Sequence, residues 1–157
     1  MLGENYEIDK TDLKILSLLS EDAKMPYTEI AKQLNVSNGT IHVRLKKMED
    51  SGIVKGSSLS IDYSKLGLDV CAFLGIYLEK SAFYDDVVNE LKEIKEIVNI
   101  HYTTGAYSIF IKLFCRDTVH LRNVLHDQIQ KINGIERTET IISLDENLNR
   151  QIHLDTR

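Results

Sequence analysis

A short stretch near residue 40 gathers side chains that are typical of contacts with nucleic acid. In the run NVSNGTIHVRLKKMEDSGIV, residues 35–54, hydrogen-bonding side chains stand close to several cations. Asn38 and His42 are four residues apart, so in a helix they lie on the same side, one turn from each other. Amide and imidazole groups can hydrogen-bond base edges, whereas arginine and lysine neutralise phosphates. This pattern favours binding to DNA.

The same run is predicted to form one helix that begins after Ser37 and ends near Gly52. Ser37 can cap the first turn, and Gly52 stands where helices commonly end. Ile41, Leu45 and Met48 follow at helical spacing and form a stripe that we expect to be buried. The DNA contacts are then expected from residues on and beside the opposite side, namely Ser37, Asn38, Gly39, Thr40, His42, Val43, Arg44, Lys46 and Lys47.

These nine residues divide into three roles by side-chain type. Ser37 and Thr40 would position the start of the helix. Arg44, Lys46 and Lys47 would neutralise phosphates, and the rest of the set would face base edges. For any one of these residues, an ordinary surface helix with solvated charges is the alternative. The agreement of several features along the run favours the DNA interpretation.

Two shorter helices are predicted before this one. The first covers residues 9–20 with Asp9 as its cap, and the second covers residues 27–34 with Thr28 as its cap. A tight turn at Asn35–Val36 separates the second helix from the third. Two helices joined in this way are typical of a helix-turn-helix, in which the second helix of the pair enters the major groove.

The segment IVKGSSLSID, residues 53–62, is predicted as a strand, a turn and a second strand. It would form a wing with Lys55 and Gly56 at its tip. The whole chain has a net charge of −5, so nucleic-acid binding has to come from a local patch. Residues 38–55 supply such a patch, because they contain four basic and two acidic side chains.

The pattern changes around YSKLGLD, residues 63–69, and the second half reads as strand, helix, strand, strand, helix, strand. This order is typical of a ferredoxin-like βαββαβ sandwich. The predicted fold class is therefore α+β. The domains are a winged helix-turn-helix at 1–62, a linker at 63–69, and a ferredoxin-like αβ domain at 70–157.

One face of the predicted sheet has no helix to cover it. The last helix, expected over residues 117–132, turns its own apolar stripe towards the other face. Because the strands are apolar, we expect a second copy of the chain to cover the free face. The stripe on the last helix consists of Leu121, Leu125, Ile129 and Ile132.

Several function classes lack support in the sequence. No apolar run is long enough to span a bilayer, and the N-terminal residues do not resemble a signal peptide, so we expect a cytoplasmic protein without a membrane part. Cys71 and Cys115 stand in separate apolar runs, which favours buried thiols, although a disulfide stays possible. No metal-ligand spacing, nucleophile motif or phosphate loop is present, so neither a metal, a cofactor nor an enzyme is expected.

The sequence resembles the leucine-responsive regulator/AsnC family of bacterial and archaeal transcription factors. In the first half the resemblance is carried by DKTDLKILSLL, YTEIAKQLNVSNGTIHVRLKKMEDSGIVKG and YSKLG. In the second half it is carried by YTTGAYSIFIKLFCR and IERTETIISL. It covers essentially the whole chain, and TIHVR together with YTTGAYSIFIK is most similar to the asparagine-responsive branch of the family.

The resemblance implies a regulator of transcription that binds double-stranded DNA. It also implies homodimers formed through the C-terminal sheets, and usually four dimers closed into an octamer. An amino-acid effector, asparagine in this branch, would bind between sensing domains near a strand–strand turn. On this chain the implied effector residues are Thr103, Thr104, Gly105, Ala106, Tyr107 and Ser108, with Thr138 and Thr140 on the last strand.

The physical chemistry of this turn allows two interpretations. Backbone groups at Gly105 could hold the carboxylate and ammonium of an amino acid, with hydroxyls from Ser108 and the threonines. The alternative is an ordinary hairpin in which these hydroxyls satisfy the turn backbone. Many family members place Asp just after the glycine, whereas Ala106 and Tyr107 follow it here. For the whole protein, the alternative is a metabolite-binding or enzyme-regulatory module that uses its helix-turn-helix for protein contacts.

Overall fold

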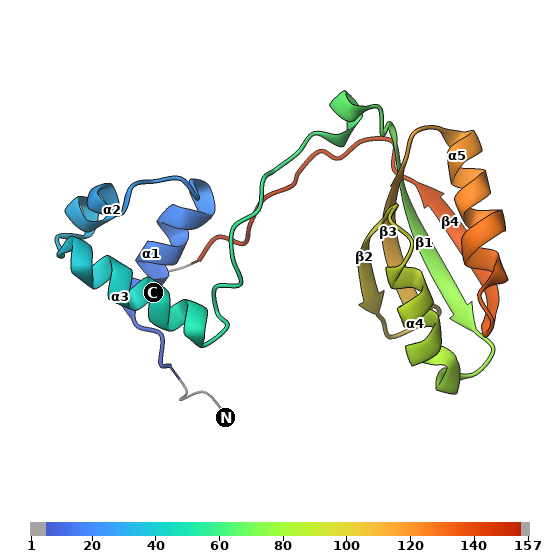
Figure 1. Cartoon of the computed structure of the whole chain (residues 1–157), viewed down its shortest axis with the longest axis horizontal. Coiled ribbons are helices and arrows are strands. Elements are labelled where there is room, and N and C mark those ends of the chain that lie inside the picture. The colour runs from blue at the N-terminus through green and yellow to red at the C-terminus, as the bar shows by residue number, and fades with distance from the viewer. Residues whose placement is uncertain (1–5, 155–157) are drawn as a thin grey trace. The chain divides into compact units, whose positions relative to one another are not determined.

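The computed structural model describes residues 6–154 of the chain. The chain forms two compact units, which are Met1–Ser60 with Leu148–Arg157 and, between them, Ile61–Asn147 (Figure 1). The C-terminal segment therefore groups with the first unit, although we expected it to belong to the second domain. Each unit has a hydrophobic core of its own. Among the described residues no helix is long and apolar enough to cross a membrane.

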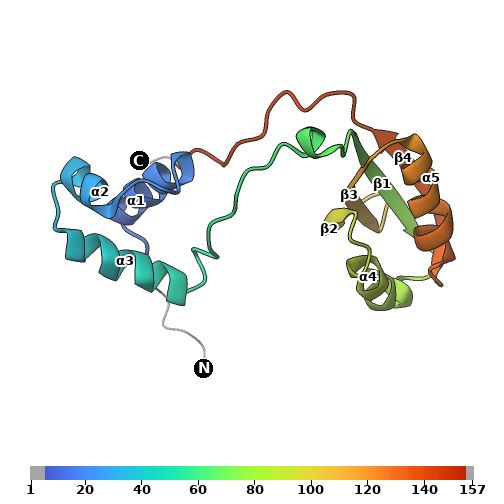
Figure 2. The ribbon, with the colours of Figure 1, turned by 45° about the horizontal axis from the view of Figure 1, so that its top comes forward.

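In the described part of the N-terminal unit there are three helices, namely α1 (Lys10–Glu21), α2 (Tyr27–Leu34) and α3 (Asn38–Asp50) (Figure 2). As predicted, Asp9 caps α1, since its carboxylate accepts hydrogen bonds from the amides of Thr11 and Asp12. The Asp12 carboxylate in turn accepts from the Asp9 amide and completes a capping box.

The turn between α2 and α3 confirms the predicted helix-turn-helix. Asn35 ends α2 in the left-handed conformation with φ 54°, and Ser37 caps α3 through the Thr40 amide. The expected cap of α2 was wrong. Pro26 occupies the N-cap position, and Thr28 lies inside the first turn. Proline suits the start of a helix because its φ is already near the helical value and its missing N–H would have had no partner there.

The predicted strand pair of the wing is absent from this chain. Residues 53–62 contain no β-strand, and Gly56 has a φ of +133°. Val54 packs partly buried against the N-terminal core, whereas Leu59 and Ile61 remain 74% and 47% exposed, so most of the segment has no packing partner. An isolated two-stranded ribbon is marginal in water without such packing, which explains the extended backbone.

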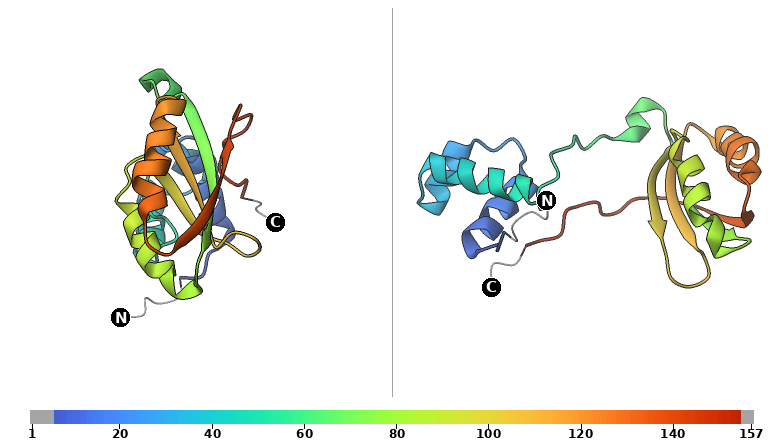
Figure 3. Two further views of the ribbon diagram at one scale, coloured as in Figure 1. Left: turned by 90° about the vertical axis from the view of Figure 1, so that its right-hand side faces the viewer. Right: turned by 60° about the horizontal axis from the view of Figure 1, so that its bottom comes forward.

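The C-terminal unit confirms the ferredoxin-like prediction. Its four strands form one antiparallel sheet in the order β2-β3-β1-β4. Both helices lie on the same side of this sheet (Figure 3). The elements are β1 (Val70–Leu78), α4 (Tyr84–Lys92), β2 (Ile97–Tyr102), β3 (Ile109–Cys115), α5 (Thr118–Asn123) and β4 (Ile135–Ile142).

The two faces of the sheet differ in burial. In β3 the residues alternate between buried and partly buried positions, as expected when one face is covered by helices and the other is not. The face without helices, called the open face below, carries Phe73 and Phe110, whose rings stack 5.8 Å apart. Lys112 lies beside Phe73 on this face, and its ammonium bonds to Glu146 at 2.8 Å.

The last helix differs from its prediction. After α5 the chain continues as a π-helical turn, Val124–Gln128, and a short 3-10 turn, Ile129–Lys131. The predicted apolar stripe included Leu125, but this residue is only partly buried. Its neighbour Val124 is fully buried instead. The π turn accommodates the five-residue step from Val124 to Ile129, so both apolar side chains reach the core.

Cys71 and Cys115 are free thiols, in agreement with the favoured interpretation. Cys71 pairs with Phe114 across the sheet, whereas Cys115 pairs with Val70. Neighbouring strand residues face opposite sides of a sheet, so the two cysteines lie on opposite faces. Burial raises the pKa of the Cys115 thiol to about 11.

Candidate nucleic-acid interface and effector turn

The two sides of α3 separate as the sequence predicts. Ile41 and Met48 are fully buried and Leu45 is 6% exposed, so the apolar stripe holds the helix against the N-terminal core. We call the opposite side the reading surface. It consists of Asn38, Gly39, His42, Val43, Lys46 and Lys47, all of which are exposed.

Ser37 and Thr40 organise the first turn of α3. The Thr40 amide donates to the Ser37 hydroxyl at 3.1 Å, and the two hydroxyls lie 2.8 Å apart. These hydrogen bonds satisfy one of the free amides at the helix start. This geometry suits the positioning role expected for both residues.

The structure gives Arg44 a different task from the phosphate contact that we expected. Its guanidinium donates to Asp9 at 2.7 Å and to Asp12 at 2.9 Å. Asp12 is fully buried and also accepts from the Tyr6 hydroxyl at 3.0 Å. Hydrogen bonds to Asp12 and Asp9 raise the pKa of Arg44 above its ordinary value. Arg44 therefore ties α3 to the start of α1, and two carboxylates already neutralise its charge.

The two lysines of the reading surface are better placed for DNA phosphates. Lys46 is 75% exposed and has only a distant partner, the Asp50 carboxylate 3.8 Å away. Lys47 is exposed and has no ion pair with any described residue. Exposed pairs of this kind contribute little free energy, so an incoming phosphate can displace Asp50 at small cost.

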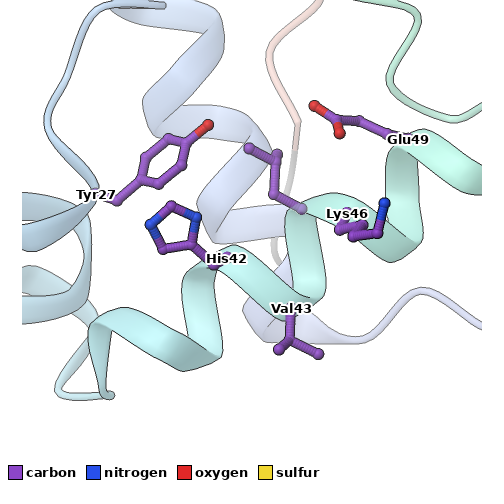
Figure 4. A pocket seen from close by; sticks show the side chains of 6 residues that line it. Tyr27, His42, Val43, Lys46 and Glu49 are labelled. Atoms are coloured by element: carbon purple, nitrogen blue, oxygen red, sulfur yellow. The ribbon is translucent and has the colours of Figure 1, made fainter.

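His42 has a neighbour that the sequence analysis missed. The ring of Tyr27, the first residue of α2, meets the His42 ring edge to face with centroids 4.7 Å apart (Figure 4). The two rings line a cleft of about 330 Å³ together with side chains further along α3. The available signal was the position of Tyr27 one turn before a buried pair, Ile30 and Ala31, but spacing alone did not connect it with His42.

The predicted effector residues on the turn between β2 and β3 do come together. Gly105 has a φ of +100°, which a side chain would strain. The Thr103 hydroxyl donates to the Tyr107 carbonyl at 2.8 Å, and the Thr103 amide donates to the Ser108 carbonyl at 3.2 Å. Thr103 thus supports the turn itself, while Thr104 and Ala106 are exposed at its tip.

Tyr107 reaches away from the tip of this turn onto the open face of the sheet. Its hydroxyl donates to Glu139 on β4 at 2.8 Å, and its ring covers Gly75 on β1. A Cβ at Gly75 would lie 2.4 Å from the Tyr107 ring, so this close approach requires glycine. The bond to Tyr107, followed by one from Tyr77, holds the pKa of the Glu139 carboxyl below its ordinary value.

Thr138 and Thr140 do not share a face with Tyr107. They pair across the sheet with Ile76 and Leu74, which belong to the core beneath the helices. Cross-strand partners face the same side, so both threonines point towards the helices. The residue between them, Glu139, is the one that reaches the turn through Tyr107, and the sequence analysis did not select it.

Histidine, cysteine and acidic side chains elsewhere in the described residues are the possible metal ligands. Among residues 6–154, no group of three or more histidine, cysteine or acidic side chains is arranged to hold a metal ion. His120 contacts Glu96, which is 8% exposed, at 3.2 Å, while its other ring nitrogen accepts from the Arg116 amide. This pair joins the start of α5 to the loop before β2. Each ring nitrogen of His120 thus has a hydrogen-bond partner.

Comparison with protein families supports both halves of this description. Residues 8–55 match the family of winged helix-turn-helix DNA-binding domains. Residues 71–151 match the Lrp/AsnC ligand binding domain. The two matches cover α1 to α3 and, apart from Val70, the sheet with its helices, so they include the reading surface and the effector turn.

Similar proteins extend these matches to the whole chain. The regulatory protein AsnC of Haemophilus influenzae is 47% identical over 94% of this chain and 98% of its own. The structure of Escherichia coli AsnC matches with a TM-score of 0.89 and 42% identity over 94% of this chain and 99% of its own. A feast or famine regulatory protein of Mycobacterium tuberculosis, complexed with L-methionine, shares the fold with a TM-score of 0.88 and 22% identity, over 95% and 100% of the two chains.

Proposed function

The chain belongs to the Lrp/AsnC family of transcriptional regulators, and we propose that asparagine controls how it occupies specific sites on double-stranded DNA. Membership supplies the general activity, which is DNA binding by the helix-turn-helix and binding of an amino acid by the C-terminal domain. The relatives are regulatory proteins, in agreement with the expectation that this chain is not an enzyme. The bacterial cytoplasm is the compartment that suits such a role.

The single observation that carries the DNA-binding proposal is the exposed, partly cationic side of α3. Asn38 and His42 offer hydrogen-bonding groups to base edges, while Gly39 and Val43 allow close and apolar contact. Lys46 and Lys47 neutralise phosphates, and Ser37 with Thr40 fixes the helix start. Arg44 has no part in this set because Asp9 and Asp12 hold it.

Asparagine is the effector that the resemblance to AsnC proteins favours. The methionine complex of the Mycobacterium tuberculosis relative supports an amino acid as the class of ligand. The turn Thr103–Ser108 presents exposed backbone groups at Thr104 and Ala106, and these can bind the two charged ends of an amino acid. Thr138 and Thr140 face the other side of the sheet, so we leave them out of the proposed site.

We further propose homodimers that pair through the open face and assemble into an octamer. Phe73, Phe110 and Phe114 gather on this face around Lys112, and Ile141 on the edge strand is 51% exposed. Apolar surface of this kind favours burial against a second copy. Several dimers would then contact several DNA sites at once, which multiplies weak affinities.

Thermal unfolding with each of the twenty amino acids tests the effector proposal. At a hundred times the dissociation constant, a ligand that binds only the folded chain adds about 2.7 kcal/mol of stability. We therefore expect asparagine to raise the melting temperature of the full-length chain by several degrees, and aspartate to raise it less. Equal melting temperatures for all twenty would reject an amino-acid effector, and a shift with another amino acid alone would reject asparagine.

A further inference from the structure

His42 is an exposed recognition residue that its own helix does not hold in place. Among residues 6–154, no hydrogen bond or ion pair fixes either nitrogen of its ring. A side chain that is free to rotate loses conformational freedom when it binds, and this loss weakens the complex. Whether the imidazole is prearranged therefore decides how much a contact from His42 contributes to DNA binding.

Tyr27 supplies the missing restraint from a different helix. It follows Pro26 at the start of α2, and its side chain packs partly buried against the N-terminal core. The rings of Tyr27 and His42 meet at an interplanar angle of 76° with centroids 4.7 Å apart. Aromatic pairs favour this edge-to-face arrangement, so the tyrosine ring, which packs against the core, favours one orientation of the imidazole.

The Tyr27 ring bounds one side of the imidazole. In Figure 4 the Tyr27 ring lies directly beside the His42 ring, whereas Val43 points away from both. Lys46 and Glu49 line the same cleft further along α3. Tyr27 occupies the side of the imidazole towards α2, while the His42 side chain stays exposed and shares the cleft with Lys46 of the reading surface.

We propose that Tyr27 is a positioning residue for DNA recognition, whose ring fixes the imidazole of His42 in the orientation that meets the DNA. The proposal rests on the DNA contact of His42 proposed above. The Tyr27 hydroxyl has no hydrogen-bond partner in the described part of the chain, so the ring carries the contact. We therefore expect phenylalanine at position 27 to preserve DNA binding and an aliphatic side chain there to weaken it.

A double-mutant cycle on the full-length chain tests this proposal. A duplex that the wild-type protein selects from a random-sequence pool, in the presence of asparagine, serves as the probe, and fluorescence anisotropy gives the affinity. We expect His42→Ala to weaken binding about tenfold and Tyr27→Leu about fivefold. In the His42→Ala background, Tyr27→Leu should have no further effect, because nothing is left to position. Tyr27→Phe should stay within about twofold of wild type.

The outcomes separate this proposal from the proposed function. If the wild-type chain selects no duplex, the proposed function fails and the role of Tyr27 fails with it. If it selects one but the two substitutions act additively, or His42→Ala binds like wild type, only the role of Tyr27 is overturned. A loss with Tyr27→Phe as large as with Tyr27→Leu would assign the contact to the hydroxyl and also overturn it.

A second readout distinguishes positioning from general support of the fold. Melting temperatures of all variants should agree with wild type within a few degrees, and Tyr27→Met replaces Tyr27→Leu should the latter not fold. Repeated selection with Tyr27→Leu and with His42→Ala should relax base preference at the same position of the duplex. Lys47→Ala, which removes a charge from the reading surface, should leave that preference unchanged.

Discussion

Replacing Arg44 with methionine is expected to destabilise the N-terminal unit by about 3 kcal/mol, because it leaves a buried carboxylate without its cation. Asp12 is fully buried, and its bond to Arg44 is 2.9 Å long. Methionine keeps much of the volume of the arginine stem, so lost packing adds little. Hydrogen exchange of the α1 and α3 amides in the full-length chain measures the effect, and we expect it to become roughly a hundredfold faster.

The matched control removes the charge of Asp12 at the same time. Asn in place of Asp12 still offers an oxygen to the Asp9 amide, so the capping box is largely kept. The double variant Arg44→Met with Asp12→Asn should therefore be more stable than Arg44→Met alone. If hydrogen exchange is unchanged in Arg44→Met and DNA binding depends less on salt, the account is wrong here. Arg44 is then a phosphate contact, as we expected from the sequence.

Replacing Lys46 and Lys47 together with alanine is expected to weaken DNA binding about thirtyfold for each α3 that contacts the duplex, at about 1 kcal/mol for each phosphate contact. The slope of log affinity against log salt concentration should fall by about 2 for each bound α3, since each lost contact releases about one counterion fewer. Both side chains are exposed, so stability should not change. Anisotropy titrations at several salt concentrations measure the affinity and the slope.

A second double variant controls for the change in net charge. Lys80 and Lys92 are exposed lysines of the C-terminal unit, and no ion pair with a described residue involves them. Replacing both with alanine alters the charge of the chain equally, yet the salt dependence should match wild type. If this control reduces the slope as much as the change at Lys46 and Lys47 does, the binding depends on overall charge and α3 is not the contact.

The sequence was sufficient to predict the framework that presents α3. The Ser37 cap, the apolar spacing of Ile41, Leu45 and Met48, and the order of elements in the second half depend on local patterns, which single sequences display. These parts agree with the structure. The resemblance to a known family then supplied the function, which the pattern alone did not separate from a protein-contact module.

Local sequence patterns did not predict contacts between residues that are far apart in the chain. Arg44 stands among the cations of α3, yet its partner Asp12 is 32 residues away in the sequence. Tyr107 and Glu139 are also separated by 32 residues and meet across β1, where Gly75 leaves room for the ring. Neither partner has a sequence signature, because only the packing of the elements brings the two side chains together.

The central claim is that asparagine controls how α3 occupies DNA, and one titration tests it most directly. The affinity of the full-length chain for a duplex selected by the wild-type protein is measured with and without saturating asparagine, with aspartate as the matched control. The account predicts specific, salt-dependent binding whose affinity changes several-fold with asparagine and not with aspartate, which corresponds to a coupling free energy of about 1 kcal/mol. An affinity that asparagine leaves unchanged, an equal change with aspartate, or binding no tighter than to unrelated duplexes would contradict it.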